Sequence, residues 1–175
     1  MQFHVLRELR QKLGSVNEYD IADPRIVVDD TVLYDLTGAV RFLRTDRGLL
    51  ATVKALARLD EKCSRCLTDA VVTVGIQFQE EYVPTVDADT GAKIYISEDD
   101  EAFRIDPQFW LDLREGLRQY ILMSEPAKPL CHEACAGLCP ACGADLNQGP
   151  CDCQPSTDER WNVLAGLKKE IDEGI

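Results

Sequence analysis

The chain has 175 residues, 45% of them hydrophobic, which is enough for one domain with its own core and a small additional segment. Its 31 acidic and 19 basic residues give a formal net charge of −12. Sequence-independent binding of nucleic acid needs basic surface that releases counterions from phosphates. The composition therefore argues against a general nucleic-acid binder and favours attraction to basic partners.

The sequence shows no segment that would direct the chain to or through a membrane. Residues 1–14 carry basic residues among scattered apolar ones but no apolar core of a secretory signal. No apolar run approaches the roughly 18 residues that a membrane span needs. We therefore expect a cytoplasmic protein, and in that reducing compartment clustered cysteines are more often metal ligands or redox groups than disulfides.

Residues 1–125 are predicted to form an α+β domain, beginning with an N-terminal segment over residues 1–25. Apolar residues at positions 5, 6, 9 and 13 fit a short amphipathic helix, and Asp23-Pro24 predicts a turn. From residue 26 the apolar period changes to two, which predicts a sheet over residues 26–105.

Three segments of the predicted sheet each show one apolar face. Thr45 to Gly48 form a turn between the first two, and Asp60 to Asp69 connect the second to the third. The pattern predicts an antiparallel β-meander, or a partly closed barrel-like sheet, packed by one or two helices. The apolar faces are Val32, Tyr34, Leu36, Val40 and Phe42; Leu49, Ala51, Val53, Ala55 and Ala57; and Ala70, Val72, Val74, Ile76 and Phe78.

The rest of the domain is predicted as a loop over residues 84–91, a strand over 93–97, a solvated acidic turn over 98–101 and a helix over 106–123. Asp106 can cap that helix and Pro107 suits its first position. Residues 156–175 predict a last helix that packs back on the domain. The two tryptophans, Trp110 and Trp161, are predicted to pack these helices onto the sheet.

Six of the eight cysteines lie between residues 131 and 153, inside a predicted metal-binding segment over 126–155 with a zinc knuckle. Zinc prefers four tetrahedral ligands, and a two-residue gap lets two thiolates on one turn face the same ion. Cys139-Pro-Ala-Cys142-Gly is such a knuckle. A second cysteine pair, Cys151-Asp-Cys153, follows after a short loop and can supply the other two ligands. The first choice of ligands is therefore Cys139, Cys142, Cys151 and Cys153.

Other ligand sets remain open. Cys131 and Cys135 could supply half of the site instead, and His132 could replace a sulfur. The pair Cys63-Ser-Arg-Cys66 has three interpretations: a redox dithiol, free thiols at a strand junction, or a half-site that reaches Cys131 and Cys135. Eight cysteines divide evenly into two tetrahedral sites, which supports the last.

The cysteines favour a structural zinc ion over a catalytic one, with iron–sulfur ligation as the weaker alternative. A catalytic zinc keeps an open position and usually has His or carboxylate ligands, whereas this segment offers mainly thiolates. The sequence has only two histidines, and no phosphate-binding loop or nucleophile motif. We therefore expect no enzyme and assign no catalytic residues.

Several stretches of the sequence are characteristic when taken together: GLCPACGADLN at 137–147, Cys63-Ser-Arg-Cys66-Leu67, Leu117 to Leu122 with Pro126, Lys128-Pro129-Leu130-Cys131, and Cys151-Asp-Cys153. These stretches resemble the YceD family, whose members are named large ribosomal RNA subunit accumulation proteins. The resemblance covers residues 26–168, and the stretch at 137–147 is its most specific part. The chain has Asp158-Glu159-Arg160-Trp161 where the family tends to carry Asp-Pro-Arg-Trp.

This resemblance implies a cytoplasmic, non-catalytic role in 23S ribosomal RNA accumulation and large-subunit biogenesis. The charge of −12 adds that a basic ribosomal protein, an assembly factor or a pre-ribosomal particle is a better partner than naked RNA. Arg58, Lys62 and Arg65 are candidate partner-binding residues, with solvated strand ends as the alternative. A thiol redox or metal-dependent enzyme that uses Cys63 and Cys66 is the competing hypothesis.

Overall fold

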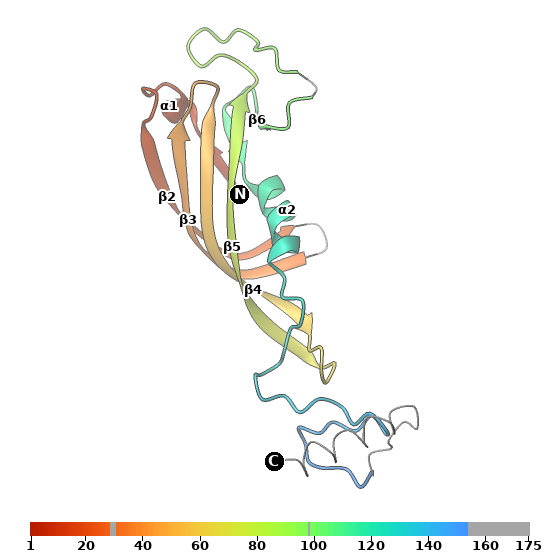
Figure 1. The fold of residues 1–175 in the computed structure, drawn as a ribbon. Coiled ribbons are helices and arrows are strands. Elements are labelled where there is room, and N and C mark those ends of the chain that lie inside the picture. Colours follow the sequence, from red (N-terminus) through yellow and green to blue (C-terminus); the bar gives the residue numbers. More distant parts are fainter. Residues whose placement is uncertain (29–30, 98, 154–175) are drawn as a thin grey trace, which may run out of the picture.

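The structure, a computed structural model, describes residues 1–28, 31–97 and 99–153. It contains a five-stranded sheet of order β2-β3-β4-β5-β6 and a two-stranded sheet that pairs β1 with β7 (Figure 1). The two helices of these residues are α1 (Leu6–Leu9) and α2 (Arg114–Ser124). The strands are β1 (Gln2–His4), β2 (Val16–Val28), β3 (Thr31–Arg44), β4 (Leu49–Lys62), β5 (Asp69–Pro84), β6 (Phe103–Ile105) and β7 (Trp110–Asp112).

The predicted three-stranded meander is present, and a fourth long strand precedes it. β2 to β5 pair antiparallel in chain order, so the sheet begins at Val16 and not at residue 26. Asp23-Pro24 lies within β2 and forms no turn, which corrects the prediction. Proline is tolerated there because β2 is an edge strand, where a missing N–H breaks no ladder bond on its open side.

The apolar faces of β4 and β5 follow the predicted alternation, whereas that of β3 does so only in part. All five predicted positions of β4 are buried. In β3, Leu36, Val40 and Phe42 are buried, but Val32 and Tyr34 are not, and Leu33 is buried instead. The pairing of β3 with β4 shifts between Tyr34 and Thr37, around Asp35 with a φ of 50°. A bulge adds one residue, which reverses the inward and outward positions beyond it.

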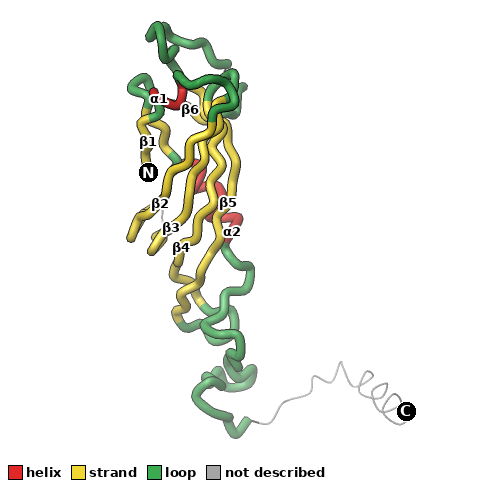
Figure 2. The backbone as a smooth tube through the Cα atoms, turned by 90° about the vertical axis from the view of Figure 1, so that its left-hand side faces the viewer, coloured by secondary structure: helices red, strands yellow, loops and turns green. Residues whose placement is uncertain are grey.

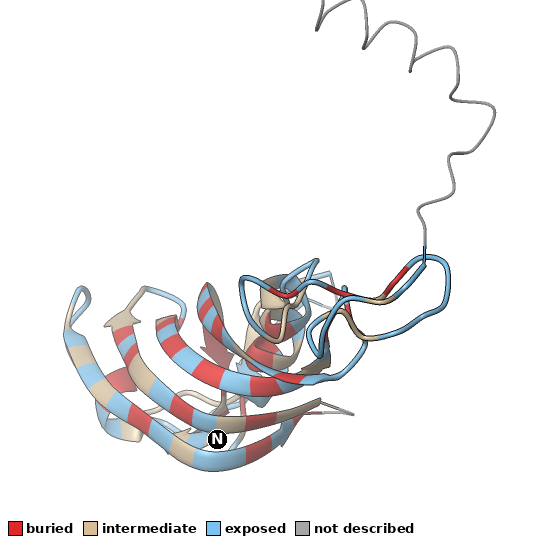
Figure 3. Cartoon of the chain, turned by 90° about the horizontal axis from the view of Figure 1, so that it is seen from below, coloured by how far each residue is buried: buried red, intermediate tan, exposed pale blue. Residues whose placement is uncertain are grey.

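The concave face of the sheet holds the core, because α2, α1 and β1 all pack against it (Figure 3). Leu117 and Ile121 of α2 are buried there, as are Val5 and Leu9 around α1. The helix expected to reach Leu13 has only four residues, and Leu13 is 67% exposed. The sheet stays open, since its edge strands β2 and β6 do not pair, and the barrel-like closure is not found.

The helix predicted from Asp106 begins only at Arg114. Asp106 Oδ1 accepts hydrogen bonds from the backbone N–H groups of Gln108 and Trp110, and this turn leads into β7. Trp110 pairs with His4 of β1 and is 42% exposed, so the prediction that it packs a helix onto the sheet is wrong. Asp caps a turn as readily as a helix, which is why the local signal was ambiguous.

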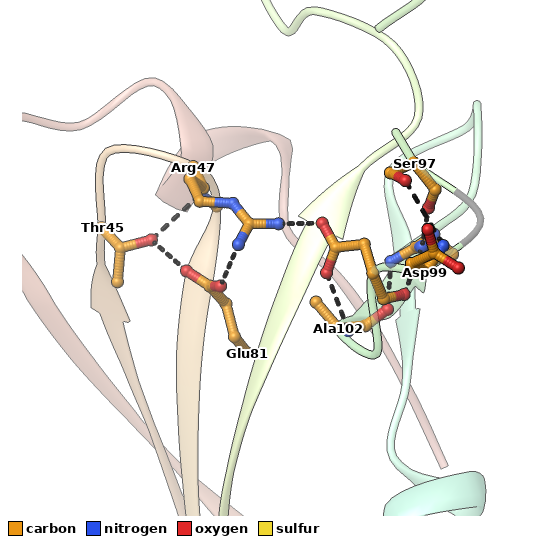
Figure 4. A network of polar contacts seen from close by, with 9 residues as sticks. Thr45, Arg47, Glu81, Ser97, Asp99 and Ala102 are labelled. Carbon is orange, nitrogen blue, oxygen red and sulfur yellow. Dashed lines mark hydrogen bonds and ion pairs between the residues drawn. The ribbon is translucent and has the colours of Figure 1, made fainter. Parts of the chain in front are cut away.

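Ion pairs of Arg47 tie the β3–β4 turn to strand β5 and to the loop between β5 and β6. Its guanidinium contacts both Glu81 and Asp100, and Thr45 donates to Glu81 (Figure 4). The strand predicted over residues 93–97 is absent from the described residues of that loop, which contribute one isolated bridge between Val86 and Lys93. Asp100, from the acidic run expected to be solvated, is thus an ion-pair partner.

The cysteine-rich segment lies at the far end of the β4–β5 hairpin, away from the main core (Figures 1 and 2). The chain reaches it from the end of α2 through residues 125–130. The last predicted helix, with Trp161, lies outside the described residues. Among the helices that the structure describes, none is long and apolar enough to span a membrane.

Candidate metal centres

The described cysteines form two groups of four thiols, and within each group all Sγ atoms lie within 4.8 Å of one another. We call Cys63, Cys66, Cys131 and Cys135 the hairpin tetrad, and Cys139, Cys142, Cys151 and Cys153 the loop tetrad. The loop tetrad is the set that the sequence put first. Cys131 and Cys135, the alternative ligands, lie beside Cys63 and Cys66. This is the grouping expected if the eight cysteines form two sites of four.

The hairpin tetrad begins with the turn between β4 and β5. Cys63 N–H donates to the carbonyl of Thr68 at 2.9 Å, and Leu67 N–H donates to the carbonyl of Cys63 at 2.9 Å. Leu67 takes a φ of 62°, a conformation that is uncommon outside glycine and lets the chain reverse sharply. The turn holds both of its cysteines inward, and Cys63 and Cys66 are 0% and 5% exposed.

Backbone hydrogen bonds dock the second half of the hairpin tetrad onto this turn. Ser64 N–H donates to the carbonyl of Pro129 at 2.8 Å, and Leu138 N–H donates to the carbonyl of Arg65 at 3.2 Å. The Arg65 guanidinium donates a hydrogen bond of 2.7 Å to the carbonyl of Cys135. The contact is close at Gly137, where a Cβ would lie 3.2 Å from the Arg65 carbonyl oxygen and φ is 77°. Glycine suits this position because it has no Cβ to clash and adopts a positive φ without strain.

The sulfurs of the hairpin tetrad are close enough to share one ion. Cys63 Sγ lies 3.8 Å from Cys135 Sγ, and Cys66 Sγ lies 3.6 Å from Cys131 Sγ. Ala70, Leu130 and Leu138 pack around these thiols in a small apolar cluster separate from the main core. The tetrad therefore forms the centre of a second, minor core that joins the hairpin to the cysteine-rich segment.

Polar side chains surround the hairpin tetrad. Asn147 Nδ2 donates to Cys135 Sγ at 3.4 Å, while Asn147 Oδ1 accepts from Ala136 N–H at 2.8 Å. Thr68 Oγ1 lies 3.0 Å from Cys66 Sγ. Such partners orient thiolates and disperse their charge. Sequence reasoning missed both residues. Asn147 ends the specific GADLN stretch, which was a usable signal.

His132 lies beside the hairpin tetrad but does not join either group. Its Nδ1 is 3.1 Å from Cys131 Sγ, and the two residues are adjacent in sequence. Both candidate groups consist of cysteines alone. His132 is thus placed as a hydrogen-bonding neighbour of a thiol, and the structure groups four sulfurs without it.

The loop tetrad is built on the expected knuckle. Cys139 N–H donates to the carbonyl of Ala144, and Gly143 N–H donates to the carbonyl of Cys139, both at 2.8 Å. Gly143 has a φ of 75°, as a tight turn after the second cysteine requires. Ala141 N–H donates to Cys139 Sγ at 3.4 Å. Gly149 and Pro150 then bring back the Cys151–Cys153 pair.

The thiols within each tetrad differ in acidity. Backbone N–H donors, first that of Cys66, lower the pKa of Cys63 to about 5, and the N–H of Cys142 with that of Ala141 lowers the pKa of Cys139 to about 6. Burial and neighbouring thiols raise the pKa of Cys131 to about 12. The bond with Cys142 is the main cause that raises the pKa of Cys153 to about 12. Each tetrad thus contains one thiol that ionises readily, Cys63 or Cys139, and one with a raised pKa, Cys131 or Cys153, that keeps its proton until a cation replaces it.

The candidate partner-binding residues at the hairpin tip do not form a free basic patch. Arg58 pairs with Asp35, Lys62 pairs with Asp69, and Arg65 is bonded to the carbonyl of Cys135. The structure brings these three side chains to the same end of the hairpin, each with its own partner. Their role in binding stays a prediction.

An open, mostly antiparallel sheet with two cysteine tetrads at one end defines a cysteine-rich α+β protein that could hold metal ions. The chain belongs to the YceD family, because the family model described as "Large ribosomal RNA subunit accumulation protein YceD" matches residues 51–168. The match spans both tetrads.

Comparison with curated proteins gives several relatives. Uncharacterized proteins of Mycobacterium bovis and Mycobacterium tuberculosis are each 28% identical over 142 residues, 81% of this chain and 65% of the relative. A chloroplastic Arabidopsis thaliana protein named large ribosomal RNA subunit accumulation protein YCED homolog 1 is 28% identical over 64 residues, 36% of this chain and 20% of that protein. The chain thus spans just under two thirds of the length of the mycobacterial relatives. No solved structure matches.

Proposed function

We propose that the protein is a cytoplasmic, non-catalytic factor that supports 23S ribosomal RNA accumulation and biogenesis of the large ribosomal subunit. The observation that carries this proposal is the family match over residues 51–168, which includes all eight cysteines. The name of the plant relative points in the same direction.

Each tetrad is proposed to bind one structural Zn²⁺. Four sulfurs at about 2.3 Å from a tetrahedral ion are about 3.8 Å apart from one another. The measured separations of 3.8 and 3.6 Å in the hairpin tetrad support this geometry. An iron–sulfur cluster with several irons would hold its cysteines farther apart than the 4.8 Å limit of these groups, because metal–metal spacing adds to each separation. Soft thiolate ligands in a tetrahedron favour zinc.

Zinc in these sites would order a stretch that has few core residues of its own. Between residues 126 and 153, Cys135 and Cys139 are the buried apolar residues. Such short segments usually need a metal or a disulfide to fold. The hairpin tetrad would fix the segment to the sheet, and the loop tetrad would fix the fold of the segment itself.

The proposed partner is a basic ribosomal protein, a basic assembly factor or a basic region of a pre-ribosomal particle. The chain carries a formal charge of −12. Each zinc ion with four thiolates adds a charge of about −2 at the hairpin end. Three basic side chains toward the tip of the β4–β5 hairpin, those of Arg58, Lys62 and Arg65, are already paired or hydrogen-bonded. Long-range attraction therefore acts on cationic partners, and phosphate is repelled.

The competing redox enzyme has less support. Cys63 has a lowered pKa, which a reactive thiol needs, but its side chain is 0% exposed and lies among three other thiols. A substrate disulfide could not reach it without opening the tetrad. Reactive cysteines are usually at least partly exposed.

Affinity purification from growing cells tests the proposal directly. The tagged full-length chain should recover basic large-subunit proteins or assembly factors at low salt, with RNA recovered through them. Nuclease treatment should leave the protein partner bound. Recovery of naked ribosomal RNA without any basic protein would contradict the proposed partner class.

A further inference from the structure

The two tetrads differ in how far solvent reaches their ligands. In the hairpin tetrad three of the four cysteines are buried: Cys63, Cys66 and Cys135. In the loop tetrad only Cys139 is buried, and both Cys142 and Cys153 are exposed. An incoming molecule can therefore approach the loop tetrad from solvent on the side of two of its ligands.

The two tetrads also differ in the side chains that support their sulfurs. Thr68, His132 and Asn147 each lie within hydrogen-bonding distance of a sulfur of the hairpin tetrad. No side chain other than a cysteine has such a bond to the loop tetrad within residues 1–28, 31–97 and 99–153. Supporting partners fix ligand orientation, and their loss commonly weakens a site by tenfold or more.

Charge adds to this difference. The hairpin tetrad has the Arg65 guanidinium bonded to the carbonyl of one of its own ligands. The loop tetrad carries Asp152 between two of its cysteines, as the hairpin tetrad carries Glu133, but within residues 1–28, 31–97 and 99–153 no guanidinium or ammonium group is hydrogen-bonded to the loop tetrad. A closed thiolate site with a charge of about −2 is less stable beside a carboxylate than beside a cation.

We propose that the loop tetrad is an exchangeable zinc site, which gives up its ion to an incoming small thiol chelator while the hairpin tetrad keeps its own. The inference rests on the proposed zinc occupancy of both tetrads. In the exchange two incoming thiolates of the chelator would form bonds to zinc as the bonds to Cys153 and Cys142 break, and the ion would leave when a second chelator replaces Cys139 and Cys151 in the same way. Each leaving thiolate takes a proton from water, and no atom changes its oxidation state.

The consequence is local because the segment has two independent attachments. Ser64, Arg65 and Leu138 hold residues 129–138 on the hairpin through hydrogen bonds that do not involve the loop tetrad. Loss of the outer ion would release the knuckle and residues 148–153, while residues 146 and 147 stay attached to the hairpin tetrad. Leu146 N–H donates to the carbonyl of Gly137, and Asn147 is bonded to Ala136 and Cys135. This end of the molecule would then have two forms, controlled by available zinc.

The test uses the full-length zinc-loaded chain and 2,3-dimercaptopropanesulfonate, a small dithiol, as the probe. Native mass spectrometry follows bound zinc, and alkylation with iodoacetamide followed by peptide mapping identifies the cysteines that are freed. We expect two zinc ions per chain, with one lost at least about tenfold faster, equal to about 1.4 kcal/mol in the barrier. Cys142 and Cys153 should be alkylated in that fast phase.

A double variant, Cys142→Ser with Cys153→Ser, should bind one zinc and show the slow phase alone. Simultaneous loss of both ions from the wild-type chain, or alkylation of Cys63 and Cys66 first, would overturn the inference while leaving zinc binding intact. Persistence of the fast phase in the double variant would also overturn it. A wild-type chain with fewer than two zinc ions would instead refute the occupancy on which it rests.

Discussion

Replacement of Gly116 by alanine should destabilise the sheet domain, because α2 lies very close to β5 at this residue. A Cβ at Gly116 would lie 2.9 Å from Phe78 Cε2 and 3.1 Å from the Tyr82 hydroxyl oxygen. Neither ring can move away freely. Phe78 stacks on Tyr120 with ring centroids 4.9 Å apart, and Tyr82 stacks on Phe103 at 5.1 Å.

Two opposing contributions decide the magnitude for Gly116→Ala. Overpacking of a dense core costs about 1–3 kcal/mol. Alanine in place of glycine inside a helix raises the free energy of unfolding by about 0.5–1 kcal/mol. Taken at the middle of both ranges, the two contributions leave a net loss in the free energy of unfolding of about 1.2 kcal/mol, or about 2–5 °C in Tm for a chain of this size.

Urea unfolding followed by far-ultraviolet circular dichroism measures this change, and Gly75→Ala is the matched control. Gly75 lies on the exposed face of β5, where the nearest atom to a Cβ would be Leu56 Cδ2 at 3.8 Å. That substitution should be neutral or stabilise by about 0.4–1 kcal/mol, because it restricts the unfolded chain. If Gly116→Ala is as stable as the wild-type chain, the close packing of α2 on β5 is wrong.

The other predictions concern pH, charge and salt. The lowered pKa values of Cys63, about 5, and Cys139, about 6, mean that these thiolates persist below neutral pH. Zinc bound at pH 7 should therefore be released as the pH falls through about 6 to 5, since protons displace the ion. Retention of zinc in dialysis at pH 4 would contradict this. Charge reversal of Arg58 and Lys62 to glutamate should change ribosome association, measured by cosedimentation, by less than about tenfold, because both are already ion-paired. A complete loss would indicate a direct phosphate contact. Capture of basic partners should weaken steeply between about 50 mM and 500 mM salt, and salt-independent capture would argue for an apolar interface.

The sequence predicted the middle of the sheet well, because β4 and β5 have one buried face and no irregularity. The errors lie where a local signal has two meanings. Pro24 predicts the end of a strand, but it lies within β2, which is an edge strand of the sheet and tolerates proline. The bulge at Asp35 reverses the pattern within β3, and periodicity alone cannot reveal an inserted residue. The start of α2 was placed eight residues early, since Asp106 caps a turn before β7.

The candidate site could be predicted in part. The spacing of Cys139 and Cys142 identified a knuckle, and the loop tetrad was the first choice of ligands. The partners of Cys63 and Cys66 lie about 65 residues further on in the sequence. Their proximity depends on α2 returning the chain to the tip of the hairpin, which no local pattern encodes. The one feature of the sequence that suggested this proximity is that eight cysteines divide evenly into two sets of four.

X-ray absorption at the zinc edge, combined with metal analysis of the purified full-length chain, tests the central claim most directly. The account predicts two zinc ions per chain, each bound by four sulfurs at about 2.3 Å with no nitrogen or oxygen ligand. One zinc ion per chain, or a shell that includes the His132 nitrogen, would contradict the assignment of two tetrads made of cysteine alone.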